Sequence, residues 1–334
     1  MGIFASVKKA KHSTYQYLVW TAVAVVLLYF SFEGVKWADF LDVLKSCRWG
    51  WVLLSMAAGL GAFIIRALRW RLLLKPMNRD IKRIDCYDGF AIGKFTDTFL
   101  PHVGEFIRCG YVCRAPLSYD KALATVVVER SWDIFTLLLI IILTLSLGWQ
   151  RFGAFAVEKI WTPVGQSFNF SLWWIVAGAG LAAVAAVIII FRLRERNAVC
   201  GKIAHFFSGM WQGALACLRM KGKGLFMLYT LVLWAMFLMM SLFIIWALPD
   251  SFGLGWVDAL FLMLVGSVAG IVPVPGGFGA FHYMVALALS ALYGVPWEMG
   301  IVFATLSHES QAVMTVVCGA AAYVHQSFFR NKIV

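Results

Sequence analysis

The sequence predicts an all-α polytopic membrane protein. We expect six full transmembrane helices and two re-entrant hairpins of broken helices, eight hydrophobic segments in all, within a single integral membrane domain (1–334). Hydrophobic residues make up 62% of the 334 residues and charged residues only 14%, a composition typical of this class. Apolar segments long enough to cross a hydrocarbon core of roughly 30 Å recur along the chain. The positive charges cluster in alternate loops, as the positive-inside rule requires.

Six segments have the length needed for a complete crossing at ~1.5 Å per residue. They are Tyr15–Phe32, Trp49–Leu74, Lys121–Gly148, Ser171–Phe191, Leu225–Leu248 and Trp297–Tyr323. Basic residues Lys8, Lys9 and Lys11 precede the first of them, and no small-residue cleavage pattern follows. We therefore predict an uncleaved first helix and a cytoplasmic N-terminus.

Two further apolar stretches, Tyr87–Arg114 and Val257–Leu292, are interrupted near their centres by proline and glycine. Irregular backbone exposed to lipid costs several kcal/mol per unsatisfied group, so each break must be buried in protein or line a polar cavity. We predict a re-entrant hairpin of half-helices in each stretch. The expected hinge residues are Pro101, Gly104, Pro273 and Pro275.

The basic loops test this arrangement. Six crossings place the loop around Lys75 to Arg83, the loop Arg192 to Lys223 and the C-terminal tail on the cytoplasmic side. A full crossing by one hairpin alone would move every later basic loop outside. Crossing by both hairpins, giving eight spans, requires an external Arg192–Lys223 loop and is disfavoured.

The basic loop itself contains apolar residues at helical spacing. They are Ile203, Phe206, Phe207, Met210, Trp211, Leu215 and Leu218. This pattern predicts an amphipathic helix on the inner membrane surface, where the basic residues favour anionic lipid. A plain connector between two halves of the protein is an equally compatible interpretation.

An internal repeat relates the two broken stretches. A shift of 172 residues places Pro101, Gly104 and Phe106 on proline, glycine and phenylalanine of the second stretch, and a shift of 180 aligns ATVVVERS with ATLSHESQ. The predicted halves are 49–148 and 225–323, joined by 149–224. Under the predicted topology the halves have opposite orientations, which is the inverted repeat of many transporters.

Charged residues occur at membrane depth in two of the spans. Glu129, Arg130 and Asp133 lie near the centre of the third span, where each costs roughly 2.5–3.5 kcal/mol without a partner. Arg130 and Asp133 are spaced for pairing on one helix face. The group forms either a structural ion pair or the lining of a substrate cavity. His308 and Glu309 lie at comparable depth in the last span.

The first hairpin carries its own polar residues around the break. Asp97 precedes Pro101, while His102, Glu105 and Arg108 follow at intervals of three. The N-terminus of a half-helix offers free N–H groups and a positive dipole end, which suits phosphate. Arg108, Arg66 and Arg69 could add charge-assisted contacts to an anionic head group. For Arg66 and Arg69, near the inner end of their span, we favour snorkelling to the membrane surface.

The second hairpin carries the glycine-rich turn Gly276, Gly277, Phe278 and Gly279, with His282 following. The turn is not a nucleotide loop, because no strand precedes it and no G-K-[ST] follows. His282 is either a packing residue or a group that contacts substrate. The seven cysteines include no C-x-x-C pair, and we expect no disulfide framework, metal site or cofactor.

Four motifs occur in the order RALRWRLLL, GKFTDTFLPHVGEFIR, ATVVVERSWDIF and PVPGGFGAFH. Together they resemble the lysylphosphatidylglycerol synthase transmembrane (flippase-like) family, over roughly Trp49 to Tyr323. The resemblance implies a flippase-like fold. His282 stands where the family usually has glutamate, and Ser310 where it usually has arginine. Bifunctional members owe their transferase activity to a soluble domain, which is not apparent here, so we expect no enzyme activity.

The sequence thus favours a flippase-like transporter in a bacterial cytoplasmic membrane, with both termini inside. Its substrate would be an anionic or aminoacylated phospholipid or a lipid-linked saccharide. The predicted residues that meet the head group are Asp97, His102, Glu105, Arg108, Glu129, Arg130 and Asp133 from one half, and the turn Gly276–Gly279, His282, His308 and Glu309 from the other. An intramembrane transferase acting on a lipid or polyprenyl-phosphate is one alternative, and a non-transporting partner of an envelope-biosynthesis complex is another. A second copy of the chain or a lipid-biosynthesis enzyme are the protein partners left open. No nucleic acid is expected, because the charges follow membrane topology.

Overall fold

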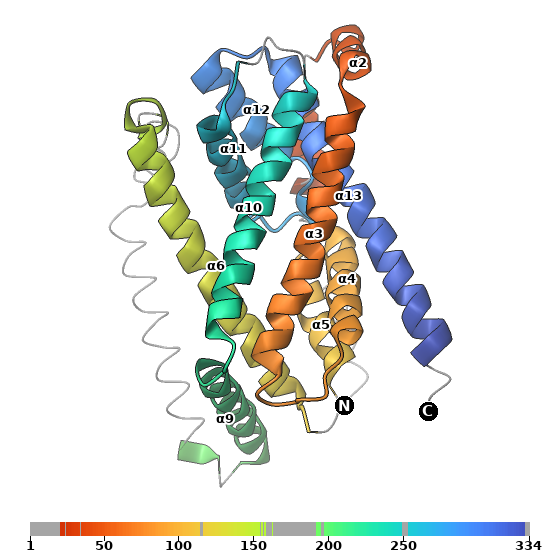
Figure 1. Cartoon of the computed structure of the whole chain (residues 1–334), viewed down its shortest axis with the longest axis vertical. Coiled ribbons are helices and arrows are strands. Elements are labelled where there is room, and N and C mark those ends of the chain that lie inside the picture. Colours follow the sequence, from red (N-terminus) through yellow and green to blue (C-terminus); the bar gives the residue numbers. More distant parts are fainter. Residues whose placement is uncertain are drawn as a thin grey trace. The chain divides into compact units, whose positions relative to one another are not determined.

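The computed structural model describes residues 21–330, except positions 24, 34, 114–115, 154, 156, 158–161, 163–191, 195–196 and 249–252. Within these residues the chain forms helices joined by turns (Figure 1). The predicted span Ser171–Phe191 lies outside the described residues, as do residues 15–20 of the first predicted span. The all-helical prediction is confirmed for the part that is described.

Four described helices are long and apolar enough to cross a membrane. They are α3 (Trp49–Leu74), α10 (Lys223–Ala247), Pro275–Tyr293 and Trp297–Phe328. The last of these consists of α13 (Trp297–His325) and the beginning of η5 (Gln326–Arg330). Helix Thr21–Phe32 and α2 (Trp37–Ser46) form a pair bent by 85°, which makes a fifth if it counts as one span. The predicted total of eight segments in an inverted repeat therefore stays a prediction.

The chain divides into two compact units. The first contains the described residues up to Arg71, then Ile81–Val112 and the described residues from Gly222 onward. The second contains Leu72–Asp80 and the described residues from Cys113 to Lys221. Both broken stretches belong to the first unit, so neither unit coincides with one predicted repeat half.

In the first unit, α3 lies beside α10 (Figure 1). The Ser55 hydroxyl donates to the carbonyl oxygen of Met240 at 3.2 Å, and the Trp51 and Phe243 rings stack 5.6 Å apart. Arg69 is fully buried, and its guanidinium donates to the Thr230 hydroxyl at 3.4 Å. The prediction that Arg69 snorkels is therefore wrong, because α10 supplies a partner inside the protein.

The first broken stretch is a tight helix pair, α4 (Arg83–Phe99) and α5 (Gly104–Val112). The two backbones touch: a Cβ on Gly104 would overlap the Gly93 carbonyl oxygen, and a Cβ on Gly93 would lie 2.7 Å from the Gly104 carbonyl oxygen. The intervening turn contains His102, which has a positive φ of 61°, an uncommon conformation for a residue with a side chain. The predicted break after Leu100 is confirmed.

The second broken stretch consists of α11 (Trp256–Ala269), the short turn η4 (Pro275–Gly277) and α12 (Ala280–Tyr293). Gly276, Gly277 and Gly279 adopt φ angles of 59°, 81° and 80°. Residues with a Cβ rarely adopt such angles. The glycine-rich run is thus required by the backbone path of the turn, as the sequence predicted.

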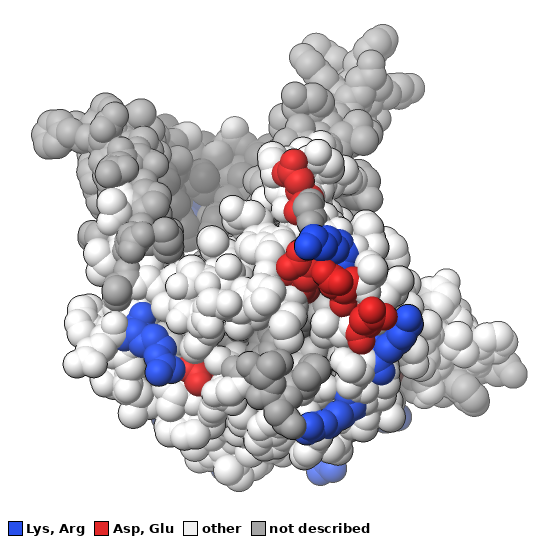
Figure 2. All heavy atoms as spheres, turned by 90° about the horizontal axis from the view of Figure 1, so that it is seen from above, with Lys and Arg blue, Asp and Glu red and all other residues white. Residues whose placement is uncertain are grey.

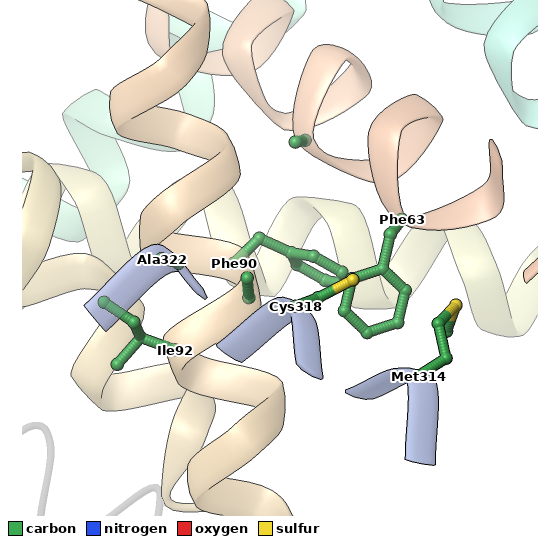
Figure 3. Packing of buried hydrophobic residues seen from close by; sticks show 8 residues of the cluster. Phe63, Phe90, Ile92, Met314, Cys318 and Ala322 are labelled. Atoms are coloured by element: carbon green, nitrogen blue, oxygen red, sulfur yellow. The ribbon is translucent and has the colours of Figure 1, made fainter. Parts of the chain in front are cut away.

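The hydrophobic core of the first unit joins α3, α4 and α13 (Figure 3). The rings of Phe63 and Phe90 meet edge to face with centroids 5.1 Å apart, a favoured aromatic geometry. Met314 and Cys318 of α13 complete the cluster together with Ala322. This packing fixes α4 against α13, and with it the end of α4 that precedes the break.

One end of the first unit carries α2. Asp42 and Lys45 of α2 are exposed and form an ion pair at 3.3 Å. Figure 2 shows acidic and basic side chains together on the face seen from this end. This end of the first unit therefore carries charges of both signs.

The second unit is built on α6 (Tyr119–Leu147), a continuous helix over the predicted span Lys121–Gly148, which leads into η1 (Trp149–Gly153). At ~1.5 Å per residue its 29 residues extend ~43 Å. Packed against it is α9 (Ala198–Leu218), whose first turn is capped by the Asn197 side chain accepting from the Val199 N–H at 2.8 Å.

The face that α9 turns to α6 is made of small residues. A Cβ on Gly213 would lie 2.8 Å from the Ala124 Cβ, and a Cβ on Gly209 would overlap the Asp120 carboxylate. The large apolar side chains Phe207 and Trp211 are instead exposed. The predicted helix in the Arg192–Lys223 loop is confirmed, and its exposed aromatic residues fit the prediction that it lies on a lipid surface.

The close contact between α4 and α5 yields a stability prediction. Gly104→Ala forces the two helices apart, and we expect a loss of about 1–3 kcal/mol and a lower apparent midpoint temperature of unfolding in detergent. Gly110→Ala on the same helix is the matched control, because its Cβ meets no heavy atom within 4 Å. It should be neutral or stabilising by up to ~1 kcal/mol. Equal midpoints for the two variants would contradict the observed packing.

Candidate functional site

A cavity of about 350 Å³ lies where the two breaks meet α13, entirely within the first unit. Its wall is formed by residues from the first break, the second break, α13 and α10. They are Lys94, Asp97, Thr98, Pro101, His102, Met240, Gly270, Val272, Val274, Gly276, Gly277, Phe278, Phe281, Ser307, His308, Gln311, Ala312 and Thr315. The structure thus brings together the two stretches that the sequence separates by about 170 residues.

The contact between the two breaks is close. A Cβ on Gly276 would lie 3.3 Å from the Thr98 carbonyl oxygen, so the turn η4 packs directly on the end of α4. Of the predicted site residues, the cavity wall includes Asp97, His102, His308 and the beginning of the glycine-rich turn. Pro101 and Pro273 both lie in the connections between helices, at corresponding places in the two stretches.

Asp97 organises the first break. One carboxylate oxygen accepts a hydrogen bond from the Gly104 N–H at 2.7 Å, and the other forms an ion pair with Lys94 at 3.1 Å. The backbone N–H that begins α5 is therefore already satisfied. This corrects the expectation that this N–H is free to bind phosphate: the cation that an anion meets in the cavity is Lys94, 31% exposed.

His308 organises the second break. Its Nε2 lies 2.9 Å from the Gly276 carbonyl oxygen, and its Nδ1 lies 3.1 Å from a carboxylate oxygen of Glu309. The Phe278 ring meets the imidazole edge to face, 5.0 Å between centroids. His308 thus ties α13 to the turn by satisfying a carbonyl that has left the regular helix ladder.

Behind the cavity wall, His282 of α12 is 2% exposed and its Nε2 lies 3.4 Å from the same Glu309 oxygen. The two imidazole centroids are 5.2 Å apart. The sequence interpretations of His282, as packing residue or as functional group, both fit its burial. The hydroxyl of Ser31 donates to the Gly279 carbonyl oxygen at 3.4 Å and holds the start of α12.

The pair Glu105 and Arg108 does not line the cavity. Arg108 is 1% exposed, pairs with Glu105 at 2.6 Å, and places its guanidinium 4.6 Å from the Trp70 ring centroid and 5.7 Å from that of Phe90. Both charges are thus directed into the packing between α5, α4 and α3. Their observed surroundings are those of a structural ion pair with cation–π contacts.

Glu129, Arg130 and Asp133 form a charged group along α6 in the second unit. Arg130 lies 3.4 Å from Asp133 and 3.8 Å from Glu129, and Glu129 is fully buried. The predicted pairing at i,i+3 is confirmed. Because these residues belong to the other unit, their role in a substrate site stays a prediction.

Lys94 and Gln311 are two of the polar cavity residues that the sequence analysis did not identify. Lys94 stands one turn before Asp97, where it resembles an ordinary helix-surface lysine. Gln311 of α13 lines the cavity, and its side-chain amide donates to the Ser55 carbonyl oxygen at 3.3 Å. The spacing of Lys94 and Asp97 at i,i+3 beside a helix break is the pattern that would have identified the pair.

The apolar helices, the two broken pairs and the cavity between them define a multi-pass helical membrane protein. The sequence profile described as "Lysylphosphatidylglycerol synthase TM region" matches residues 17–319. The chain therefore belongs to this family, as the resemblance of its motifs predicted. No curated protein and no solved structure matches the chain. Family membership indicates a function related to membrane lipid.

The buried pair in the first hairpin gives a second prediction. Arg108→Gln leaves Glu105 without its cation and removes the contact with Trp70, and we expect a loss of about 3 kcal/mol, measured as a lower midpoint temperature of unfolding. Lys45→Gln is the control, because its pair with Asp42 is exposed and contributes at most about 1 kcal/mol. A stable, correctly folded Arg108→Gln protein would contradict a structural role for the pair.

Proposed function

We propose that the protein translocates a lipid between the leaflets of a bacterial cytoplasmic membrane, and that the head group passes through the cavity between the two breaks. The observation that carries this proposal is the convergence of both breaks on one cavity that contains charged and polar side chains. Transporters commonly place substrate where interrupted helices meet. The inverted repeat, the cytoplasmic termini and the absence of catalysis remain parts of this proposal.

The charges in the cavity indicate the kind of head group. Lys94 and Asp97 form an ion pair 3.1 Å long at the cavity wall. A head group that carries both a phosphate and an ammonium group can replace this pair with two equivalent pairs, the phosphate on Lys94 and the ammonium on Asp97. A head group with only negative charge leaves Asp97 facing a like charge. We therefore propose an aminoacylated or otherwise amine-bearing phospholipid.

The size of the cavity fits a head group rather than a whole lipid. A volume of about 350 Å³ lies at the lower end of the range for small-molecule sites. The acyl chains would then remain in the bilayer while the head group occupies the cavity. His102 and Gln311 supply further hydrogen-bonding groups at the wall.

A reconstitution experiment tests the proposal. The purified chain is incorporated into liposomes that contain a trace of fluorescent lipid, and leaflet exchange is followed by chemical quenching of the outer label. We expect exchange of an amine-bearing phospholipid to exceed that of phosphatidylglycerol. Lys94→Gln should slow the exchange at least about tenfold, the effect of losing one charge-assisted contact of ~1.4 kcal/mol or more.

Comparison of Asp97→Asn with Lys94→Gln separates the contributions of the two charges in the site. Asp97→Asn retains an oxygen that can accept from the Gly104 N–H, so the hairpin should keep its fold while the preference for amine-bearing lipid is lost. Lys45→Gln on α2 is the matched control and should exchange lipid at the wild-type rate. Equal exchange by wild type, Lys94→Gln and empty liposomes for every lipid would disprove the proposal.

The charged group of α6 is tested in the same liposomes. If Arg130 lines the path of the head group, Arg130→Ala should slow the exchange as strongly as Lys94→Gln. Mass spectrometry of the lipids after the assay addresses the transferase alternative, since transport leaves every lipid unmodified. A new lipid species formed by wild type and lost in the variants would favour chemistry over transport.

A further inference from the structure

Three ligand-type side chains meet beside the turn η4: His282 of α12 with His308 and Glu309 of α13. One ligand atom from each lies within 4.8 Å of the others. The Glu309 oxygen Oε1 is common to both short contacts, 3.1 Å from His308 Nδ1 and 3.4 Å from His282 Nε2. No short sequence motif reveals this cluster, because His282 and His308 lie on different helices.

The hydrogen bond to the turn decides which His308 nitrogen is available. A carbonyl oxygen only accepts, so the contact of 2.9 Å between His308 Nε2 and the Gly276 oxygen requires a proton on Nε2. In neutral imidazole, Nδ1 then presents a lone pair to the Glu309 carboxylate 3.1 Å away. Two lone pairs at this distance repel each other unless a cation lies between them. The geometry thus calls for a cation at this place.

His282 supplies an independent observation. The side chain is 2% exposed, its Nε2 faces Glu309, and its Nδ1 is buried without a hydrogen-bond partner. Because Nδ1 has no partner, it is unsatisfied in either neutral tautomer, and hydrogen bonding does not fix which nitrogen carries the proton. In the tautomer with the proton on Nδ1, Nε2 presents a second lone pair to the same carboxylate oxygen, and a cation bound there would use both.

We propose that His282 Nε2, His308 Nδ1 and Glu309 Oε1 bind a divalent transition-metal ion of the Zn²⁺ class. Two imidazoles and one carboxylate are a common ligand set for Zn²⁺. Ligand atoms about 2.0–2.1 Å from a tetrahedral ion are roughly 3.3 Å from one another. The two separations that involve Glu309, 3.1 and 3.4 Å, match this edge length, and the third, between the two imidazole nitrogens, is within 4.8 Å. Three protein ligands leave a fourth position for water or a substrate oxygen.

The surroundings fit this assignment. Metal-bound histidines usually donate their other N–H to a backbone carbonyl or carboxylate, which orients the ring, and the Gly276 carbonyl accepts such a bond from His308. The aromatic rings of Phe278 and Phe281 lie 5.0 and 5.2 Å from His308 and shield the cluster. Bound metal would join α12, α13 and the turn η4. This inference does not depend on the transport proposal.

Direct metal binding is the test. The full chain, purified in detergent with any histidine tag removed, is stripped with a chelator and titrated with Co²⁺, whose visible absorption reports its coordination. We expect one Co²⁺ per chain, displaced by Zn²⁺. His282→Gln and Glu309→Gln should each weaken Co²⁺ binding at least about tenfold. His325→Gln, at the other end of α13 and bonded to Asp88 at 2.7 Å, is the control and should bind normally.

A second measurement protects the test against misfolded variants. Zn²⁺ should raise the midpoint temperature of unfolding of wild type and of His325→Gln, but not of Glu309→Gln, because a ligand stabilises only the state that binds it. Failure of the wild type to bind Co²⁺ would overturn the proposal, and the cation between His308 and Glu309 would then be a proton. Equal Co²⁺ affinity of wild type and Glu309→Gln would overturn it as well.

Discussion

The structure of the first unit depends on one constraint: a broken helix must satisfy the backbone groups that it releases. Regular helices satisfy these groups within one segment, whereas the two breaks cannot. Asp97 accepts from the Gly104 N–H in the first break, and His308 contacts the Gly276 carbonyl in the second. Each polar side chain that repairs a break also faces the cavity. Structural repair and candidate function are therefore carried by the same residues.

This double role of the polar residues explains the composition of the cavity wall. An uncompensated carboxylate at this depth would be costly, and Lys94 lowers that cost for Asp97. Beside the second break, behind the cavity wall, the Glu309 carboxylate is compensated by two imidazoles. The two breaks thus use different chemistry, a permanent ion pair in the first and a cluster of metal-ligand type in the second. Two breaks with the same side chains at corresponding positions would not differ in this way.

Much of the fold followed from the sequence, because single-helix properties are local. The bounds of α3 were predicted to the residue, the interruptions near Pro101 and Pro275 were located, and the helix in the basic loop was anticipated. The site was predicted less completely. His308 and Asp97 were identified, whereas Lys94 was missed and Arg108 was assigned to the site although it packs beneath Trp70. Which face of a short half-helix is turned to a cavity depends on its neighbours.

The sequence by itself determined the membrane class, the family and the positions of the breaks, since hydrophobic length, charge placement and proline or glycine act within a few residues of where they occur. Only the tertiary structure decided which polar side chains meet. His282 lies 26 positions before His308, and Thr98 is far from Gly276 in the chain, yet each pair is in contact. Such contacts arise from the packing of α4, α12 and α13, which no local pattern specifies.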